Sequence, residues 1–75
     1  MYTRRSIEFK IFEYLETKGG SATDRELFEY LRKIFDISRN EFQHIIMSLE
    51  IEGFISARSI KEDSKIIVLK RRPKQ

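Results

Sequence analysis

The sequence has no cysteine, no tryptophan, one proline and a single histidine. Without cysteine, the chain has neither a disulfide framework nor a thiolate metal site, and this composition fits an intracellular protein. Because His44 is its one histidine, a metal site would need carboxylate ligands alone. We therefore expect no metal and no cofactor.

The sequence also lacks long apolar runs and the usual catalytic motifs. No apolar run approaches the roughly 18–20 residues that a membrane span needs. The first ten residues hold two arginines but no apolar segment typical of a signal peptide, so we expect a cytoplasmic protein without a membrane partner. A Gly-rich phosphate loop, a Cys or His pair and a convergent carboxylate pair are all missing, and 75 residues are too few for a deep pocket. We expect neither an enzyme nor a small-molecule binder.

What the chain has is an uneven distribution of charge. Residues 1–55 contain eight Lys/Arg and ten Asp/Glu, whereas residues 56–75 contain seven Lys/Arg and two Asp/Glu. A local positive patch attracts a polyanion such as nucleic acid or an anionic membrane surface. The plainer alternative is a solvated basic tail. The length predicts one small domain over residues 1–70, followed by a basic, flexible tail over residues 71–75.

Apolar spacing predicts two helices in the first half of the chain. Ile7, Ile11 and Leu15 recur at helical intervals and predict a helix from Thr3 or Arg4 to Thr17, ended by Gly19-Gly20. Residues 20–22 are too short for an independent strand but long enough to extend a sheet edge. Thr23 and Glu26 have the spacing of a capping box and begin a second helix. The apolar face of that helix comprises Leu27, Phe28, Leu31, Ile34 and Phe35.

A third helix is predicted over residues 38–52. Ser38 and Glu41 repeat the capping-box spacing, and Gly53 is expected to end the helix in the left-handed conformation. Two capped helices separated by about three residues must turn sharply, as in a helix-turn-helix, with Ile37 inside the turn. Phe42, Ile45, Ile46 and Leu49 are expected to face the core. The opposite arc presents Arg39, Asn40, Gln43, His44 and Met47.

After Gly53 the apolar pattern becomes that of β-strands. Residues 54–60 and 65–70 are rich in β-branched and apolar side chains, and the polar segment 61–64 separates them. This pattern predicts a β-hairpin with a loop of three to five residues.

The predicted order of elements resembles that of the winged helix-turn-helix superfamily over nearly the whole chain. The resemblance rests on the segments GGSATDREL, SRNEF and LEIEGFI. The small size and short loops are similar to the stand-alone winged-helix proteins of archaea and their viruses. This resemblance implies an α+β fold with the order α-β-α-α-β-β. It also implies binding of double-stranded DNA, with the third helix in the major groove and the hairpin of residues 54–70 on the backbone or minor groove.

The side chains agree with a DNA-reading helix beside a basic hairpin. Asn40 and Gln43 suit adenine edges, and Arg39 suits guanine or a phosphate. Glu62 and Asp63 at the hairpin tip would repel phosphates, which favours contacts through the flanking basic residues. The predicted DNA contacts are Ser38, Arg39, Asn40, Gln43, His44, Met47, Arg58, Lys61, Ser64, Lys65, Arg71 and Arg72.

A sequence-specific DNA-binding protein, and in particular a transcriptional regulator, is therefore the first hypothesis. The alternatives are a protein–protein adaptor with the same fold, or an RNA- or ribosome-binding module. Apolar residues that the helical wheels leave outside the core, such as Met47 and Ile51, would suit an adaptor. DNA-binding proteins of this kind often read two half-sites as a pair, and we predict a homodimer through the first helix, with Tyr2, Phe9 and Phe12 at its interface.

Overall fold

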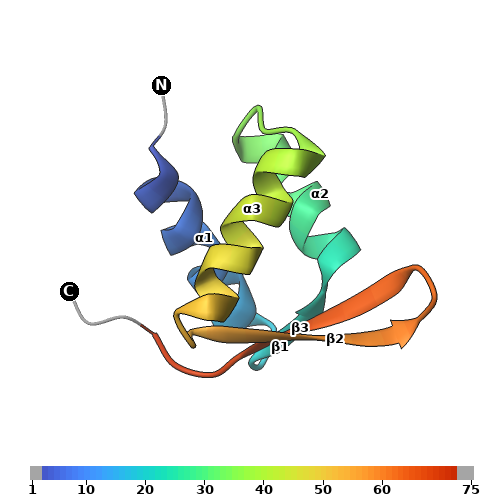
Figure 1. The fold of residues 1–75 in the computed structure, drawn as a ribbon. Helices are drawn as coiled ribbons and strands as arrows, with labels where there is room; N and C mark the ends of the chain where they lie inside the picture. The colour runs from blue at the N-terminus through green and yellow to red at the C-terminus, as the bar shows by residue number, and fades with distance from the viewer. Residues whose placement is uncertain (1–2, 73–75) are drawn as a thin grey trace.

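The computed structural model describes residues 3–72, which form three helices and a three-stranded antiparallel sheet (Figure 1). The elements follow the predicted order, so the α+β class is confirmed and the layout is compatible with a winged helix. They are α1 (Arg4–Thr17), β1 (Ser21–Thr23), α2 (Asp24–Ile34), α3 (Arg39–Ile51), β2 (Ile55–Lys61) and β3 (Ser64–Leu69).

Both predicted capping boxes are present and set the starts of α2 and α3. The side chain of Thr23 accepts from the Glu26 backbone N–H, and the Glu26 carboxylate accepts from the Thr23 N–H. Ser38 and Glu41 form the same reciprocal pair at 3.1 Å each. Each box satisfies backbone donors that the first turn of a helix would otherwise leave unpaired. Between the two helices, Ile37 is buried in the turn as predicted.

The stop at the end of α3 is also the predicted one. Gly53 has φ +84°, a left-handed conformation that is costly for residues with a Cβ. Its N–H donates to the Glu50 carbonyl, and the Phe54 N–H donates to the Leu49 carbonyl, both at 3.0 Å. This pair of bonds is the Schellman arrangement, which turns the chain out of α3 and into β2.

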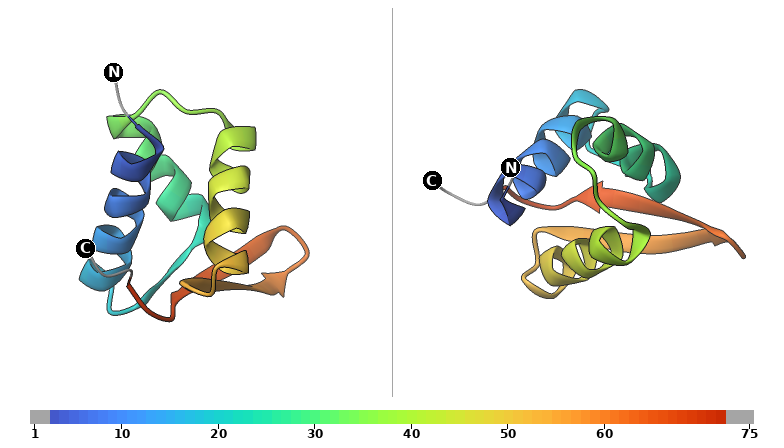
Figure 2. Two further views of the ribbon diagram at one scale, coloured as in Figure 1. Left: turned by 60° about the vertical axis from the view of Figure 1, so that its left-hand side comes forward. Right: turned by 90° about the horizontal axis from the view of Figure 1, so that it is seen from above.

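The sheet has the order β1-β3-β2, so the last strand of the chain is the central one. The helices lie on one face of this sheet, and the β2–β3 hairpin extends past them on the side away from α1 (Figures 1 and 2). The paired residues Ala22 and Ile67 and the nearby Ile55 are buried on the helix side. The prediction that the segment near Ser21 would extend the sheet is confirmed.

The hairpin loop is shorter than predicted. β2 continues to Lys61 and β3 begins at Ser64, which leaves Glu62 and Asp63 as the turn. The pairing shifts between Ser59↔Lys65 and Lys61↔Ser64, so β2 contains one extra residue there. The extra residue forms a bulge within β2 and is not part of the loop. The predicted loop of three to five residues was therefore wrong.

The core contains apolar side chains from all three helices and from the sheet. No polar or charged residue is buried within residues 3–72. Ile34 was expected in the core but is 47% exposed. Ile34 is the last residue of α2. The backbone becomes extended at Phe35 (φ −119°), and the Phe35 side chain is the one that is buried in the core. The residues below 2% exposure are Phe42, Ile11, Leu15, Leu27, Leu31, Leu49, Ile55 and Ile67.

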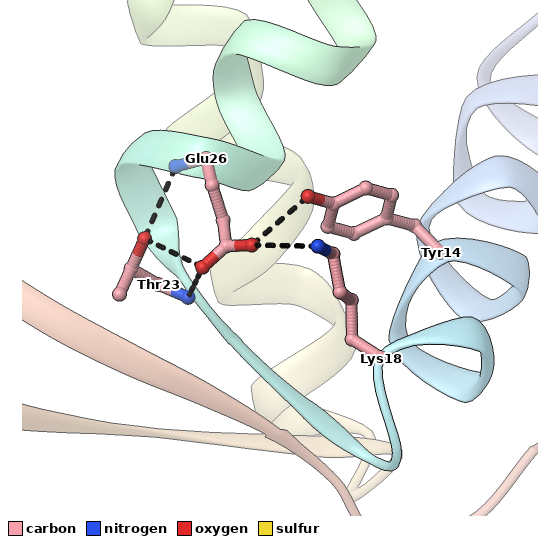
Figure 3. Close-up of polar contacts among 4 residues, drawn as sticks. All are labelled: Tyr14, Lys18, Thr23 and Glu26. Atoms are coloured by element: carbon pink, nitrogen blue, oxygen red, sulfur yellow. Dashed lines mark hydrogen bonds and ion pairs between the residues drawn. The ribbon is translucent and has the colours of Figure 1, made fainter.

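The Glu26 carboxylate joins α1 to the start of α2 (Figure 3). Its Oε1 accepts from the Tyr14 hydroxyl at 2.9 Å and lies 3.7 Å from the Lys18 ammonium, while Oε2 accepts from the Thr23 N–H at 3.1 Å. The Thr23 backbone N–H, followed by the Tyr14 hydroxyl, lowers the pKa of Glu26 below its ordinary value. Burial, followed by the bond to Glu26, raises the pKa of Tyr14.

We predict that this carboxylate makes the fold less stable in acid. Because the folded-state pKa of Glu26 lies below its ordinary value of 4.5, the unfolded chain binds the proton more tightly. The contribution is present above that value and is lost as pH falls through the folded pKa. Glu26→Gln keeps an acceptor for Thr23 but removes the charge. Urea unfolding should show wild type more stable than this variant at neutral pH, with the difference shrinking in acid.

The matched control for this measurement is Glu29→Gln. Glu29 lies on the outer side of the same helix, and its carboxylate is 4.0 Å from Arg32. An ion pair as exposed as this one contributes little to stability. A difference between wild type and Glu26→Gln that stayed constant from neutral to acid pH would contradict the prediction.

Candidate nucleic-acid interface

The outer face of α3 presents the side chains that the sequence predicted. Phe42, Ile45, Ile46 and Leu49 are buried, and this fixes the rotation of the helix about its axis. The opposite face is therefore solvent-exposed. It carries Arg39, Asn40, Gln43, His44 and Met47, with Ser38 exposed at the cap.

The polar members of this face gather in the first half of α3. Ser38 and Glu41 form the capping box there, which accounts for one negative charge near the proposed interface. The Glu41 carboxylate accepts from the Ser38 backbone N–H, and its negative charge interacts favourably with the positive end of the helix dipole. The second half of the face is more apolar, with Met47 and a 79% exposed Ile51. The chemistry suited to base edges is therefore concentrated near the helix start.

Arg39 is the most constrained side chain of this surface. Its guanidinium carbon lies 5.1 Å from the centre of the Phe28 ring, a cation–π distance. Its Nη2 is 3.8 Å from Oδ2 of Asp24. The Arg39 side chain remains 52% exposed, whereas that of Asp24 is only 14% exposed. The Arg39 guanidinium thus contacts Phe28 and Asp24 of α2, while about half of the side chain remains exposed.

Asp24 also contacts the hairpin. Its Oδ1 accepts from the Lys65 backbone N–H at 3.4 Å. The sheet register explains this contact: β1 ends where Thr23 pairs with Ile66, so the next residue lies beside Lys65. A single carboxylate therefore contacts both the start of α3 and the start of β3. The sequence did not predict this role of Asp24, because the β1–β3 register is not a local signal.

The hairpin places its two main basic residues on opposite faces. Directly paired residues project to the same side of a sheet, and successive residues alternate. Ala57 and Ile67 are paired and face the helices, as do Ser59 and Lys65 two positions further along each strand. Arg58, paired with Ile66, projects from the other face. Lys65 therefore lies on the same side of the hairpin as α2 and α3, and Arg58 does not.

The remaining predicted residues of the hairpin lie near its tip. Lys61 is exposed and Ser64 is half-buried, and the two are paired across the turn. Glu62 and Asp63 are exposed between them. The tip thus has mixed charge, as the sequence indicated.

Arg71 and Arg72 do not join the predicted surface. Arg72 contacts α1, where its Nη1 is 2.6 Å from the Glu16 carboxylate and its guanidinium lies over the Phe9 ring. Arg71 lies over the Phe54 ring and donates to the Glu52 carbonyl, at the end of α3. Both arginines are at the α1 end of the molecule, opposite the hairpin tip. The predicted flexible tail begins at residue 71; its first two residues make these contacts, and residues 73–75 lie outside the described part.

The predicted dimer surface on α1 is reduced to one residue. Phe12 is 2% exposed and packs edge-on against Phe54 at 6.0 Å, so it belongs to the core and offers no area to a second chain. Phe9 remains 41% exposed beside Arg72. Tyr2 lies outside the described residues.

Groups of three or more His, Asp or Glu side chains arranged to hold a metal ion are absent from residues 3–72. A surface groove between α1 and α3 is lined by Arg4, Glu8, Ser48, Ile51 and Glu52, and a second lies beside the stacked rings of Tyr14 and Tyr30.

Across the same residues, no helix combines the length and hydropathy of a membrane span. Comparison with family models, curated protein sequences and solved structures finds no match for this chain.

The cap of α3 gives a stability prediction. Ser38→Ala removes the acceptor for the Glu41 N–H and should lower the free energy of unfolding by about 1 kcal/mol. Ser59→Ala, on an exposed part of β2, is the matched control and should change stability little. Urea denaturation of both variants measures the difference. An equal loss in the two would show that the cap does not stabilise α3.

Proposed function

We propose that this chain is a winged-helix protein that binds double-stranded DNA in a sequence-specific manner, as a transcriptional regulator does. In this proposal the first half of α3 enters the major groove and reads base edges. The side of the hairpin that carries Lys65 lies against the backbone, and Lys61 contributes near the tip.

The observation that carries the proposal is the exposed polar cluster at the start of a rigidly held helix. Asn40, Gln43 and His44 project outward from α3, whose other side is buried in the core. Their amide and imidazole groups are hydrogen-bonding groups suited to base edges. The short turn keeps α3 next to α2, and Phe28 packs against Phe42 between them, so α3 is held by the core as reading a groove with one helix requires.

On the hairpin, Lys65 supports the proposal more directly than Arg58 does, although the sequence predicted both as DNA contacts. Lys65 projects on the helix side, and its backbone N–H donates to Asp24, whose carboxylate also contacts the Arg39 side chain of α3. It is therefore placed to contact a phosphate next to the bases that α3 would read. Arg58 would reach DNA only if the hairpin enters a groove edge-on, with its two faces toward opposite strands.

Salt dependence tests DNA binding itself. With about four phosphate contacts, affinity for a duplex should fall roughly 100-fold between about 50 and 200 mM monovalent salt, because each contact releases counterions. Fluorescence anisotropy with a labelled random duplex measures this slope. Failure of the wild-type chain to bind any duplex at the lower salt concentration would exclude the function.

Substitutions separate base reading from backbone contact. Asn40→Ala and Gln43→Ala should each cost about 1–3 kcal/mol on a selected duplex and much less on a random one. Lys65→Ala should weaken binding to both duplexes alike and flatten the salt slope. The matched control is Lys33→Ala, which removes an exposed lysine from α2 outside the proposed surface. Equal affinities of wild type, Asn40→Ala and Gln43→Ala for both duplexes would rule out α3 as the reading element.

One observation favours a protein-binding adaptor as the second candidate. Met47 and Ile51 are large apolar side chains exposed on the same helix, toward its end. An adaptor would bind no duplex at moderate salt, so the salt titration separates the two functions. The same titration with single-stranded RNA tests the third alternative, an RNA-binding module. Homodimerisation through α1 stays a prediction that now depends on Phe9.

A further inference from the structure

The carboxylate of Asp24 touches two elements that the proposed function uses separately. Its Oδ2 lies 3.8 Å from the Arg39 guanidinium on α3, and its Oδ1 accepts from the Lys65 N–H on β3. Phe28 lies under the same guanidinium. Asp24 and Phe28 are on α2, which makes no contact with DNA in the proposed arrangement. Asp24 and Phe28 therefore affect the proposed DNA-reading surface only through their contacts with Arg39.

A guanidinium held in this way loses little further freedom on binding. The aromatic ring fixes one face of the planar group, and the carboxylate fixes one of its edges. Because the Arg39 side chain is still 52% exposed, part of it remains accessible to a ligand. An arginine that is ordered before it meets its ligand gains affinity, since less conformational entropy is lost on binding.

The position of the carboxylate favours a base over a phosphate as the ligand of Arg39. A negative charge 3.8 Å from the guanidinium repels an approaching phosphate anion. The N7 and O6 atoms of guanine are neutral acceptors and experience much weaker repulsion. Arginine at the start of a helix in the major groove pairs with these two atoms through two parallel N–H groups. The carboxylate thus selects against the nonspecific ligand.

The bond to Lys65 gives the same carboxylate a second consequence. The residue that contacts Arg39 thus also contacts the side of the hairpin that bears Lys65. A phosphate held by Lys65 and a base read by Arg39 would then be bound by two residues that share one carboxylate.

We propose that Arg39 reads a guanine, and that Asp24 and Phe28 are positioning residues that hold it in the reading conformation. This inference rests on the proposed function and specifies one base of its target. Asp24 acts through Arg39 and need not touch DNA.

The test compares wild type with Arg39→Lys, Asp24→Asn and Glu29→Gln. Each protein selects duplexes from a random library, and the preferred base at each position is determined. Arg39→Lys keeps the charge and loses the paired N–H groups. Asp24→Asn keeps an acceptor for the Lys65 N–H and loses the charge beside Arg39. Glu29→Gln is the control, because it removes one negative charge from α2 away from Arg39.

Wild type and Glu29→Gln should select one position that is consistently guanine. Changing that base pair to A·T should lower wild-type affinity about 5- to 150-fold, the range for one bidentate arginine contact. Replacing the guanine by 7-deazaguanine, which lacks the N7 acceptor, should also weaken wild-type binding. Arg39→Lys should lose the preference. Asp24→Asn should reduce it while binding random duplex as well as wild type or better, because a repulsive charge is gone.

Two results overturn the inference while leaving DNA binding intact. One is a selected sequence in which Arg39→Lys and Asp24→Asn keep every base preference of wild type. The other is an equal loss of affinity of Asp24→Asn for all duplexes, which marks a purely structural role, and a lowered thermal midpoint would accompany it. Absence of any duplex binding by wild type overturns the proposed function and this inference together.

Discussion

The first turn of α2 makes polar contacts with both other helices and with the central strand. Thr23 ends β1 and caps the helix, so the sheet and α2 share a residue. Glu26 reaches back to Tyr14 on α1, and Asp24 reaches forward to Arg39 on α3 and to Lys65 on β3. Thus α1, α3 and β3 each contact a side chain from the first turn of α2. A change in the angle of this turn would move α3 and the hairpin together.

These polar contacts specify geometry more than they supply stability. A hydrogen bond of this kind contributes about 0.5–1.5 kcal/mol net, and an exposed ion pair contributes about 0–1 kcal/mol. Full burial of one side chain such as Leu27 or Leu31 contributes about 1.5–3 kcal/mol, so the apolar core dominates the free energy of folding. The contact of Asp24 with Arg39 adds a polar restraint on the first residue of α3, and the contacts of Glu26 join α2 to α1.

The sequence predicted the helices well because their ends are local signals. A capping box occupies four consecutive residues, and the glycines at 19, 20 and 53 mark the stops without reference to the rest of the chain. The placement of the hairpin side chains could not be predicted in this way. A shift of one residue in strand pairing moves every side chain to the other face, and the register depends on β1, which is distant in sequence. For this reason Arg58 and Lys65 were grouped together although they project from opposite faces.

The basic residues show a second limit of sequence reasoning, because charge alone does not say which cations are free. Arg39, Arg71 and Arg72 each lie over an aromatic ring within residues 3–72. A guanidinium is planar and weakly hydrated, so it loses little by leaving water for a ring face. The Lys18 ammonium also lies over a ring, that of Tyr14, whereas Lys61 and Lys65 remain exposed on the hairpin.

The exposed cations are unevenly distributed over the surface, and the net charge does not reveal this. A polyanion that approaches the hairpin meets two free lysines and the open side of Arg39. At the α1 end, by contrast, Arg72 is paired with the Glu16 carboxylate. Among the described basic residues after position 55, Arg58, Lys61 and Lys65 are exposed on the hairpin, whereas Arg71 and Arg72 lie over aromatic rings. The Asp24 carboxylate, which contacts both Arg39 and the Lys65 backbone, connects these lysines to the reading face of α3 in the proposed function.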